Sequence, residues 1–345
     1  MPALPRNSIT DVSGLTVGNA HDAKLASGVT AILCETPSMA AASVFGGGPG
    51  TRELDAIALE GSVGAADAIV LSGGSAFGLD AAGGVQSYLR EAGRGFAVGT
   101  ERVPIVPQAI LFDLLNGGDK GWGRHSPYRD MAYEAARAAS LDFALGSAGA
   151  GYGATVAAGP GRRMRGGLGT ASERVLLPGE DEEGVAIGAL AAVNAAGSVT
   201  VADKPNFWAA PFEQGAEFGG LGLPAPWPAL AAQPFLKYPF PAASTTLCVV
   251  ATDAAISHAQ CHRLAVMASA GMARAIFPVF SPLDGDIVLA LSTGEKLLRM
   301  PPAALPFLGA AAANCVARAI ARGVYEASGS LPDGSPAYRE LFPRP

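Results

Sequence analysis

The sequence predicts a mixed α/β fold, because buried-strand patterns alternate along the chain with segments typical of helices. The clearest strand pattern is 247–252, whose six residues are apolar or β-branched and uncharged, as in a strand covered on both faces. A second pattern, 68–71, leads through a glycine-rich turn into a helix ending near Glu91. Residues 302–322 have the pattern of a long C-terminal helix, with Gly323 at its expected end.

The remaining elements follow the same alternation. An Ala-rich helix is expected at 129–139, and Ser257 has the character of an N-cap for a helix running to about Ala275. Residues 202–243 contain several proline-rich patches and are the least regular part of the chain, which suits a connecting segment. Further strands are expected at 28–34, 40–45, 184–192 and 287–291.

Size and composition restrict the class of protein. A chain of 345 residues suits one large α/β domain or two small ones. Charged residues make up 16%, below the roughly 25% usual for soluble domains, so we expect a homo-oligomer to cover apolar surface. We expect this oligomer to be a tetramer, a number that composition does not determine. The net charge of -6 argues against nucleic acid or an anionic membrane as partner. The basic cluster 162–165 is interpreted as a solvated loop.

The chain carries no sign of membrane insertion or export. Residues 1–7 lack the apolar core of a signal peptide, and no run of about 18 uncharged apolar residues occurs. The four cysteines are scattered rather than paired, and two lie in apolar runs where buried free thiols are ordinary. These features predict a cytoplasmic protein.

Two glycine-rich passages resemble nucleotide-binding loops only superficially. The run 46–53 lacks the lysine and Ser/Thr of a P-loop. The turn 72–80 has neither the G-x-G-x-x-G of dinucleotide sites nor the G-x-S-x-G of hydrolase elbows. Its position before a helix still suits N–H groups near Ser75 that bind a carboxylate or oxyanion, and a simple packing turn fits equally well.

A metal site is not expected. His258 and His262 stand one helical turn apart, as zinc ligands do. Ala259 occupies the position at which a metalloprotease carries its glutamate, so we predict no metal there.

The junction between Ser244 and Thr245 has the character of a reactive site. Residues 237–243 contain two prolines and cannot continue a helix or an interior strand, so the chain passes from an irregular segment straight into a sheet. We hypothesise that the backbone is cut at this junction. An N-terminal threonine would carry both a nucleophilic hydroxyl and its own base, since an α-amine titrates near ~8. Taken alone, these residues favour another interpretation over the cut, namely that Thr245 and Thr246 are β-branched residues that begin a strand.

Six motifs together resemble a known family. The family is that of the self-processing DmpA-type aminopeptidases, which includes the β-peptidyl aminopeptidases and nylon-oligomer hydrolases. The motifs occur in the family's order between about residues 8 and 325. The motifs are GGGPGTRE at 46–53, GGSAFGLD at 73–80, GAG at 149–151, VN at 193–194, the strand 245–253 and DGD at 284–286.

This resemblance implies a fold and a mechanism. The fold is a four-layer αββα sandwich of the DmpA/ornithine-acetyltransferase type, formed as a single domain over 1–345 and cut into chains 1–244 and 245–345. Short peptides, amino-acid amides or esters are the implied substrates. The implied site comprises Thr245 as nucleophile, Asn194 near the oxyanion, Asp284 and Asp286 orienting the nucleophile and its amine, and Ser75, Phe112, Gly151 and Tyr152 around the substrate.

The chain departs from the family pattern at three places. Ser244 precedes the cut where relatives have Asn or Gly, Tyr152 replaces a small hydroxyl residue, and Ala158 stands where many relatives have Lys. Two alternatives therefore stay open. One is an acyl transferase related to the ornithine acetyltransferases, and the other is an uncleaved, non-catalytic member of the fold.

Overall fold

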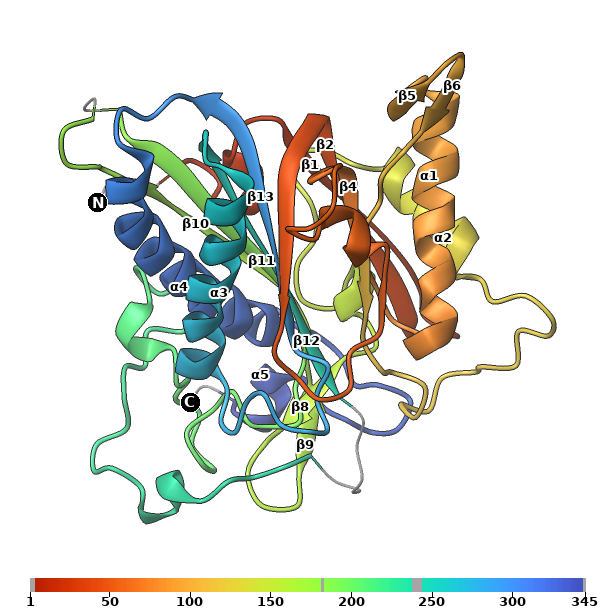
Figure 1. Ribbon diagram of the computed structural model, residues 1–345. Coiled ribbons are helices and arrows are strands. Elements are labelled where there is room, and N and C mark those ends of the chain that lie inside the picture. The colour runs from red at the N-terminus through yellow and green to blue at the C-terminus, as the bar shows by residue number, and fades with distance from the viewer. Residues whose placement is uncertain (1–3, 181–182, 238–243, 344–345) are drawn as a thin grey trace.

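The computed structural model describes residues 4–180, 183–237 and 244–343, and these form four layers (Figure 1). Helices α3 and α4 cover one face, strands β10 to β13 form the next layer, β1, β2 and β4 form the third, and α1 and α2 cover the opposite face. The αββα sandwich expected from the sequence is confirmed.

Their bounds are α1 Ala81–Glu91, α2 Tyr128–Arg137, α3 His258–Ala275, α4 Pro301–Tyr325, β1 Leu15–Asp22, β2 Ser27–Val44, β4 Ala65–Ser72, β10 Gly167–Val175, β11 Val185–Asn194, β12 Thr245–Ala254 and β13 Ile287–Lys296. Shorter elements are β3 Thr51–Arg52, β5 Phe96–Val98, β6 Glu101–Val103, β7 Gln108–Ile110, β8 Thr155–Ala157, β9 Arg163–Arg165 and α5 Tyr338–Leu341. Capping of α3 by Ser257, which accepts from the Gln260 N–H, is confirmed.

Strand β2 joins the two sheet layers. The order β10-β11-β12-β13-β2-β4-β7-β3 runs through it, with β1 paired to it as well. Residues 39–44 of β2 pair with β13, residues 29–33 pair with β4, and the register shifts between Leu33 and Ser38. The expectation of two separate strands is wrong because the exposed residues 35–37, including Pro37, interrupt the burial pattern without ending the strand.

Alternate residues of β12 face different cores. Leu247 and Val249 point into the core between the two sheet layers, whereas Cys248 and Val250 face α3 and α4. Both faces of the strand are covered, as its uncharged sequence predicts. Because residues two apart share a face, Thr245 also belongs to the face between the sheets.

Helix α4 is a core helix. By length and composition it is apolar enough to cross a membrane, but 67% of its most apolar window is buried within the fold. Gly323 does not end it, as the sequence suggested; the helix continues to Tyr325. A Cβ at Gly167 would lie 2.0 Å from the Gly323 carbonyl oxygen, and one at Gly323 would lie 2.9 Å from the Gly169 nitrogen, so these glycines allow backbone to approach backbone.

The basic cluster 162–165 is only in part the solvated loop expected from the sequence: Arg162 is exposed and outside any strand, whereas 163–165 form β9. Arg165 lies in β9 and is 3% exposed. Its guanidinium donates to the Tyr152 carbonyl oxygen at 2.5 Å and lies over the Tyr152 ring. Carbonyl acceptors and ring contact explain how an arginine is accommodated in the interior.

A buried ion pair fastens the irregular connecting segment to α4. The Arg318 Nε donates to Glu217 Oε1 at 2.6 Å, and its Nη2 donates to Glu217 Oε2 at 3.0 Å. Asn7 joins the cluster, donating to Glu217 Oε2 at 2.6 Å and accepting from Arg318 Nη2 at 2.7 Å. This part of the connecting segment is therefore irregular but fixed to α4.

Replacing Glu217 by alanine should destabilise the fold by about 3–5 kcal/mol, because Arg318 would keep its charge in the interior with only the more distant Glu173 carboxylate, at 3.9 Å, to balance it. Denaturant unfolding measures this change as a lower midpoint at unchanged slope. Glu134→Gln is the matched control, since it disrupts an exposed pair with Arg137 and should shift the midpoint little. Equal midpoints for both variants would contradict the assigned role of the buried pair.

Candidate active site

Thr245 and Asn194 face each other across two central strands. Asn194 ends β11 and Thr245 begins β12, and they are direct partners in the antiparallel register. Directly opposed residues project to the same face with Cβ atoms about 5 Å apart. Both are almost fully buried, so the fold brings two residues chosen from the sequence into one polar site.

The carbonyl oxygen of the peptide bond between Ser244 and Thr245 accepts two hydrogen bonds. The Thr245 hydroxyl donates to the Ser244 oxygen at 2.5 Å, and the Gly285 N–H donates to the same oxygen at 2.9 Å. Two donors on one carbonyl withdraw electron density from its carbon and are aimed where negative charge develops when a nucleophile adds. Gly285 was missed as a separate site residue, although it lies within the DGD motif.

The two aspartates of that motif hold backbone on either side of the junction. Asp284 Oδ1 accepts from the Ala196 N–H at 3.0 Å, just beyond β11. Asp286 accepts from the Thr246 N–H at 2.8 Å and from the Phe280 N–H at 3.0 Å. Within the described part of the chain, neither carboxylate bonds the Thr245 hydroxyl, so their contacts position the strand entrances.

Asp286 titrates in the neutral range. Burial, together with the neighbouring Asp284 carboxylate, raises the pKa of Asp286 to about 7. An α-amine at Thr245 would titrate in a similar range.

Only glycine fits at position 285. A Cβ there would lie 2.7 Å from the Thr245 hydroxyl oxygen and 2.7 Å from the Gly48 carbonyl oxygen. Both distances are shorter than real Cβ contacts. The close approach of the Gly285 backbone to the Ser244–Thr245 junction thus depends on the missing side chain.

The Asn194 amide is held at both ends. Its Oδ1 accepts from the Thr155 N–H at 3.0 Å and from Lys237 Nζ at 3.1 Å, while its Nδ2 donates to the Phe112 carbonyl oxygen at 2.9 Å. Phe112 is thereby next to Asn194. Thr155 and Lys237 were missed as site residues, since neither stands out from the sequence by composition or spacing.

Two expected oxyanion donors are already engaged. The Ser75 N–H donates to the Leu111 carbonyl at 3.0 Å, and the Gly151 N–H donates to the Ala148 carbonyl at 3.0 Å. These groups cannot stabilise an oxyanion without breaking a backbone bond, and the site roles of Ser75 and Gly151 stay predictions. The Gly285 N–H is the donor directed at the junction.

The Tyr152 ring lies in a separate aromatic contact. It stacks on His21 with ring centroids 4.4 Å apart, and its opposite contact is the Arg165 guanidinium at 5.2 Å from the centroid. The ring is half-buried there. No described hydrogen bond links Tyr152 to Thr245 or Asn194, so the substrate contact expected of Tyr152 stays a prediction.

The paired histidines of α3 face different partners. His258 Nε2 lies 3.0 Å from the Ile57 carbonyl oxygen, and His262 Nε2 lies 3.3 Å from the Ser43 hydroxyl. Among the residues that the structure describes, no group of three or more His, Cys, Asp or Glu could hold a metal ion.

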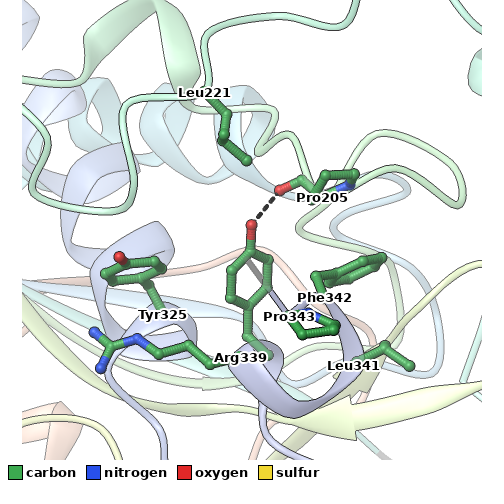
Figure 2. Close-up of a pocket in the computed structure, with 8 residues that line it drawn as sticks. Pro205, Leu221, Tyr325, Arg339, Leu341, Phe342 and Pro343 are labelled. Atoms are coloured by element: carbon green, nitrogen blue, oxygen red, sulfur yellow. Dashed lines mark hydrogen bonds between the residues drawn. The ribbon is translucent and has the colours of Figure 1, made fainter. Parts of the chain in front are cut away.

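A separate pocket of about 750 Å³ lies near the C-terminus (Figure 2). The Tyr338 hydroxyl donates to the Pro205 carbonyl across it at 2.5 Å, and Arg339 lies over the Tyr325 ring. None of the candidate catalytic residues lines this pocket. It is distinct from the site at Thr245.

The fold and the polar site at its central strands define a hydrolase of the DmpA type. The chain belongs to peptidase family S58, whose family model matches residues 7–332. The family resemblance inferred from the six motifs is confirmed. Family membership favours a hydrolase over the acetyltransferase alternative.

Relatives and solved structures agree with this assignment. The chain is 42% identical to an uncharacterized aminopeptidase of Mycobacterium tuberculosis (strain ATCC 25618 / H37Rv), covering 98% of both chains, and 40% identical to one of Mycobacterium leprae (strain TN), covering 99% of this chain and 96% of the relative. A Burkholderia sp. beta-aminopeptidase superposes with a TM-score of 0.69 at 23% identity, covering 100% of this chain and 96% of that one.

A second solved structure carries the same fold. The L-aminopeptidase D-Ala-esterase/amidase of Ochrobactrum anthropi has a TM-score of 0.68 at 21% identity, covering 95% of this chain and 88% of that one. It is described as a prototype for the serine aminopeptidases and a new variant of the Ntn hydrolase fold. These two likenesses concern the fold.

Proposed function

We propose that the protein cuts itself between Ser244 and Thr245 and then acts as an aminopeptidase through the new N-terminal Thr245. The observation that carries this proposal is the geometry of the Ser244 carbonyl oxygen, which accepts from both the Thr245 hydroxyl and the Gly285 N–H. The hydroxyl that would attack is already against the carbonyl that it would attack. A donor for the developing oxyanion is in place.

The cut follows an N-to-O acyl shift. The Thr245 oxygen adds to the Ser244 carbonyl carbon, the C–N bond breaks, and the hydroxyl proton passes to the departing nitrogen. Water then hydrolyses the resulting ester, leaving a carboxylate on Ser244 and a free amine on Thr245. The aspartates hold the Ala196 and Thr246 backbones while this happens.

The cut leaves the fold intact. Strand β12 lies between β11 and β13, and β13 pairs with β2, so the small chain 245–345 stays within the central sheet. The single αββα domain would then comprise chains 1–244 and 245–345.

Turnover uses the same groups in a second reaction. The α-amine of Thr245 accepts the hydroxyl proton as the oxygen adds to a substrate carbonyl, and the leaving amine departs. The Gly285 N–H and the Asn194 amide stabilise the oxyanion, and water releases the acyl group. Short peptides, amino-acid amides or esters are the proposed substrates, no metal or cofactor takes part, and we propose a cytoplasmic homotetramer.

Mass spectrometry of the purified protein tests the cut. We expect fragments of about 24 and 10 kDa, the shares of the 34.7 kDa chain carried by 1–244 and 245–345, with Thr245 as the first residue of the smaller one. Release of amine from a panel of aminoacyl amides then identifies the substrates. An intact chain of 34.7 kDa in active material would refute self-processing at this junction.

A further inference from the structure

Lys237 places a positive charge in the interior beside Asn194. The residue is 5% exposed, and its Nζ lies 3.1 Å from Asn194 Oδ1 and 3.5 Å from the Asn194 carbonyl oxygen. It also lies 3.3 Å from both the carbonyl and the hydroxyl oxygen of Thr155. All four partners accept hydrogen bonds, which suits an ammonium with three donors.

No carboxylate pairs directly with this ammonium within the described ranges. The charged groups around it act from further away: Asp284, Asp113 and Asp333 favour its charge, and Arg163 opposes it. Burial lowers the pKa of Lys237 to about 7, with Asp284 acting in the opposite direction. A lysine buried without a direct ion pair is costly to the fold, and this cost points to a role in the site.

We propose that Lys237 is a positioning residue for both reactions at Thr245, holding the Asn194 amide with its nitrogen available to the reacting carbonyl. This inference rests on the proposed function of Thr245. An asparagine amide has an oxygen and a nitrogen of almost equal size, and only its hydrogen-bond partners decide which way it faces. The ammonium form of Lys237 and the Thr155 N–H can only donate, so both select Oδ1.

The nitrogen end of the Asn194 amide is also fixed by a hydrogen bond. The Phe112 carbonyl can only accept, and it takes one hydrogen of Asn194 Nδ2. The second Nδ2 hydrogen stays available on the face that Asn194 shares with Thr245. Without Lys237, the oxygen end would keep only the Thr155 N–H, and the amide would lose its strongest constraint.

The backbone of Lys237 is tied to the same site. Its N–H donates to the Ala196 carbonyl at 2.9 Å, and the Ala196 N–H donates to Asp284 Oδ1 at 3.0 Å. Asp284 immediately precedes Gly285, which donates to the scissile carbonyl. Lys237 therefore connects the chain before the cut with the groups that surround the cut, and after processing it would belong to the large chain.

The variant Lys237→Met tests this role, because methionine fills the space of the lysine stem without charge or donors. Self-cleavage is followed by pulse–chase in cell-free translation, and turnover of L-alanyl and β-alanyl p-nitroanilide by the mature protein gives kcat and KM. We expect cleavage and kcat to fall on the order of 10²-fold, as for other misplaced catalytic groups, with KM little changed. Lys204→Met, which changes a half-exposed lysine of the same segment, should leave both rates unchanged.

Chemical rescue separates positioning from a merely structural role. In Lys237→Ala, added propylammonium should restore cleavage and kcat in part, whereas tetramethylammonium, a cation without N–H donors, should not. Rates within about twofold of the wild type for Lys237→Met would overturn the inference. A loss of activity in Lys237→Ala that propylammonium does not rescue, together with a lower melting temperature of that variant, would also overturn it. A wild-type chain that neither cleaves nor turns over substrate would instead refute the proposed function itself.

Discussion

Replacing Thr245 by alanine yields a chain that stays at 34.7 kDa and hydrolyses no aminoacyl amide above background. The hydroxyl that donates to the Ser244 carbonyl is the proposed attacking group in both reactions, so its loss removes both. Losing a nucleophile of this kind lowers the rate by about 10⁴-fold or more. Electrophoresis under denaturing conditions and amine release from the amide panel measure the two effects.

The neighbouring threonine supplies the control. Thr246 is fully buried, and its hydroxyl makes only a weak contact with the Asp286 carboxylate. Thr246→Val keeps the shape and the backbone N–H that Asp286 accepts, so cleavage and turnover should remain. Thr245→Ser keeps the hydroxyl and should also be cut. Cleavage of the Thr245→Ala chain at the same bond would show that another group attacks.

The second large effect is expected for Gly285→Ala. The added methyl group would meet the Thr245 hydroxyl oxygen and the Gly48 carbonyl oxygen at 2.7 Å each, and the latter belongs to backbone. Relief of this overlap must move either the nucleophile or the Gly285 N–H that binds the Ser244 carbonyl. We expect self-cleavage to slow by about 10²-fold or more, measured by pulse–chase.

Gly48→Ala is the matched substitution on the facing segment. A Cβ at Gly48 would meet its nearest atom, the Asp284 carbonyl oxygen, at an ordinary 3.7 Å. This variant should cleave at the wild-type rate. If Gly285→Ala also cleaves at that rate while remaining folded, the close approach at Gly285 does not serve the reaction.

Much of the fold could be predicted because it depends on local patterns. The uncharged run 247–252 required a strand covered on both faces, and Ser257 supplied the hydroxyl that begins α3. Two strands were predicted where β2 is continuous, because residues 35–37 are exposed. Exposed residues interrupt the apolar pattern of a strand whether or not its backbone pairing ends. Gly323 misled because a helix also uses glycine where another backbone packs against it.

The sequence by itself predicted strand β12 and proposed the junction at Ser244 and Thr245, and its motifs marked Asn194 and the DGD segment as candidates for the site around it. Only the tertiary structure decided which groups meet there: the Gly285 N–H at the Ser244 carbonyl, and an ammonium supplied by Lys237 where the family pattern at Ala158 had suggested that a lysine was lost. Lys237 and Asn194 lie 43 residues apart, and Lys237 belongs to no strand, so only the packing of the irregular segment against the sheet brings them together. Periodicity along the chain carries no information about them.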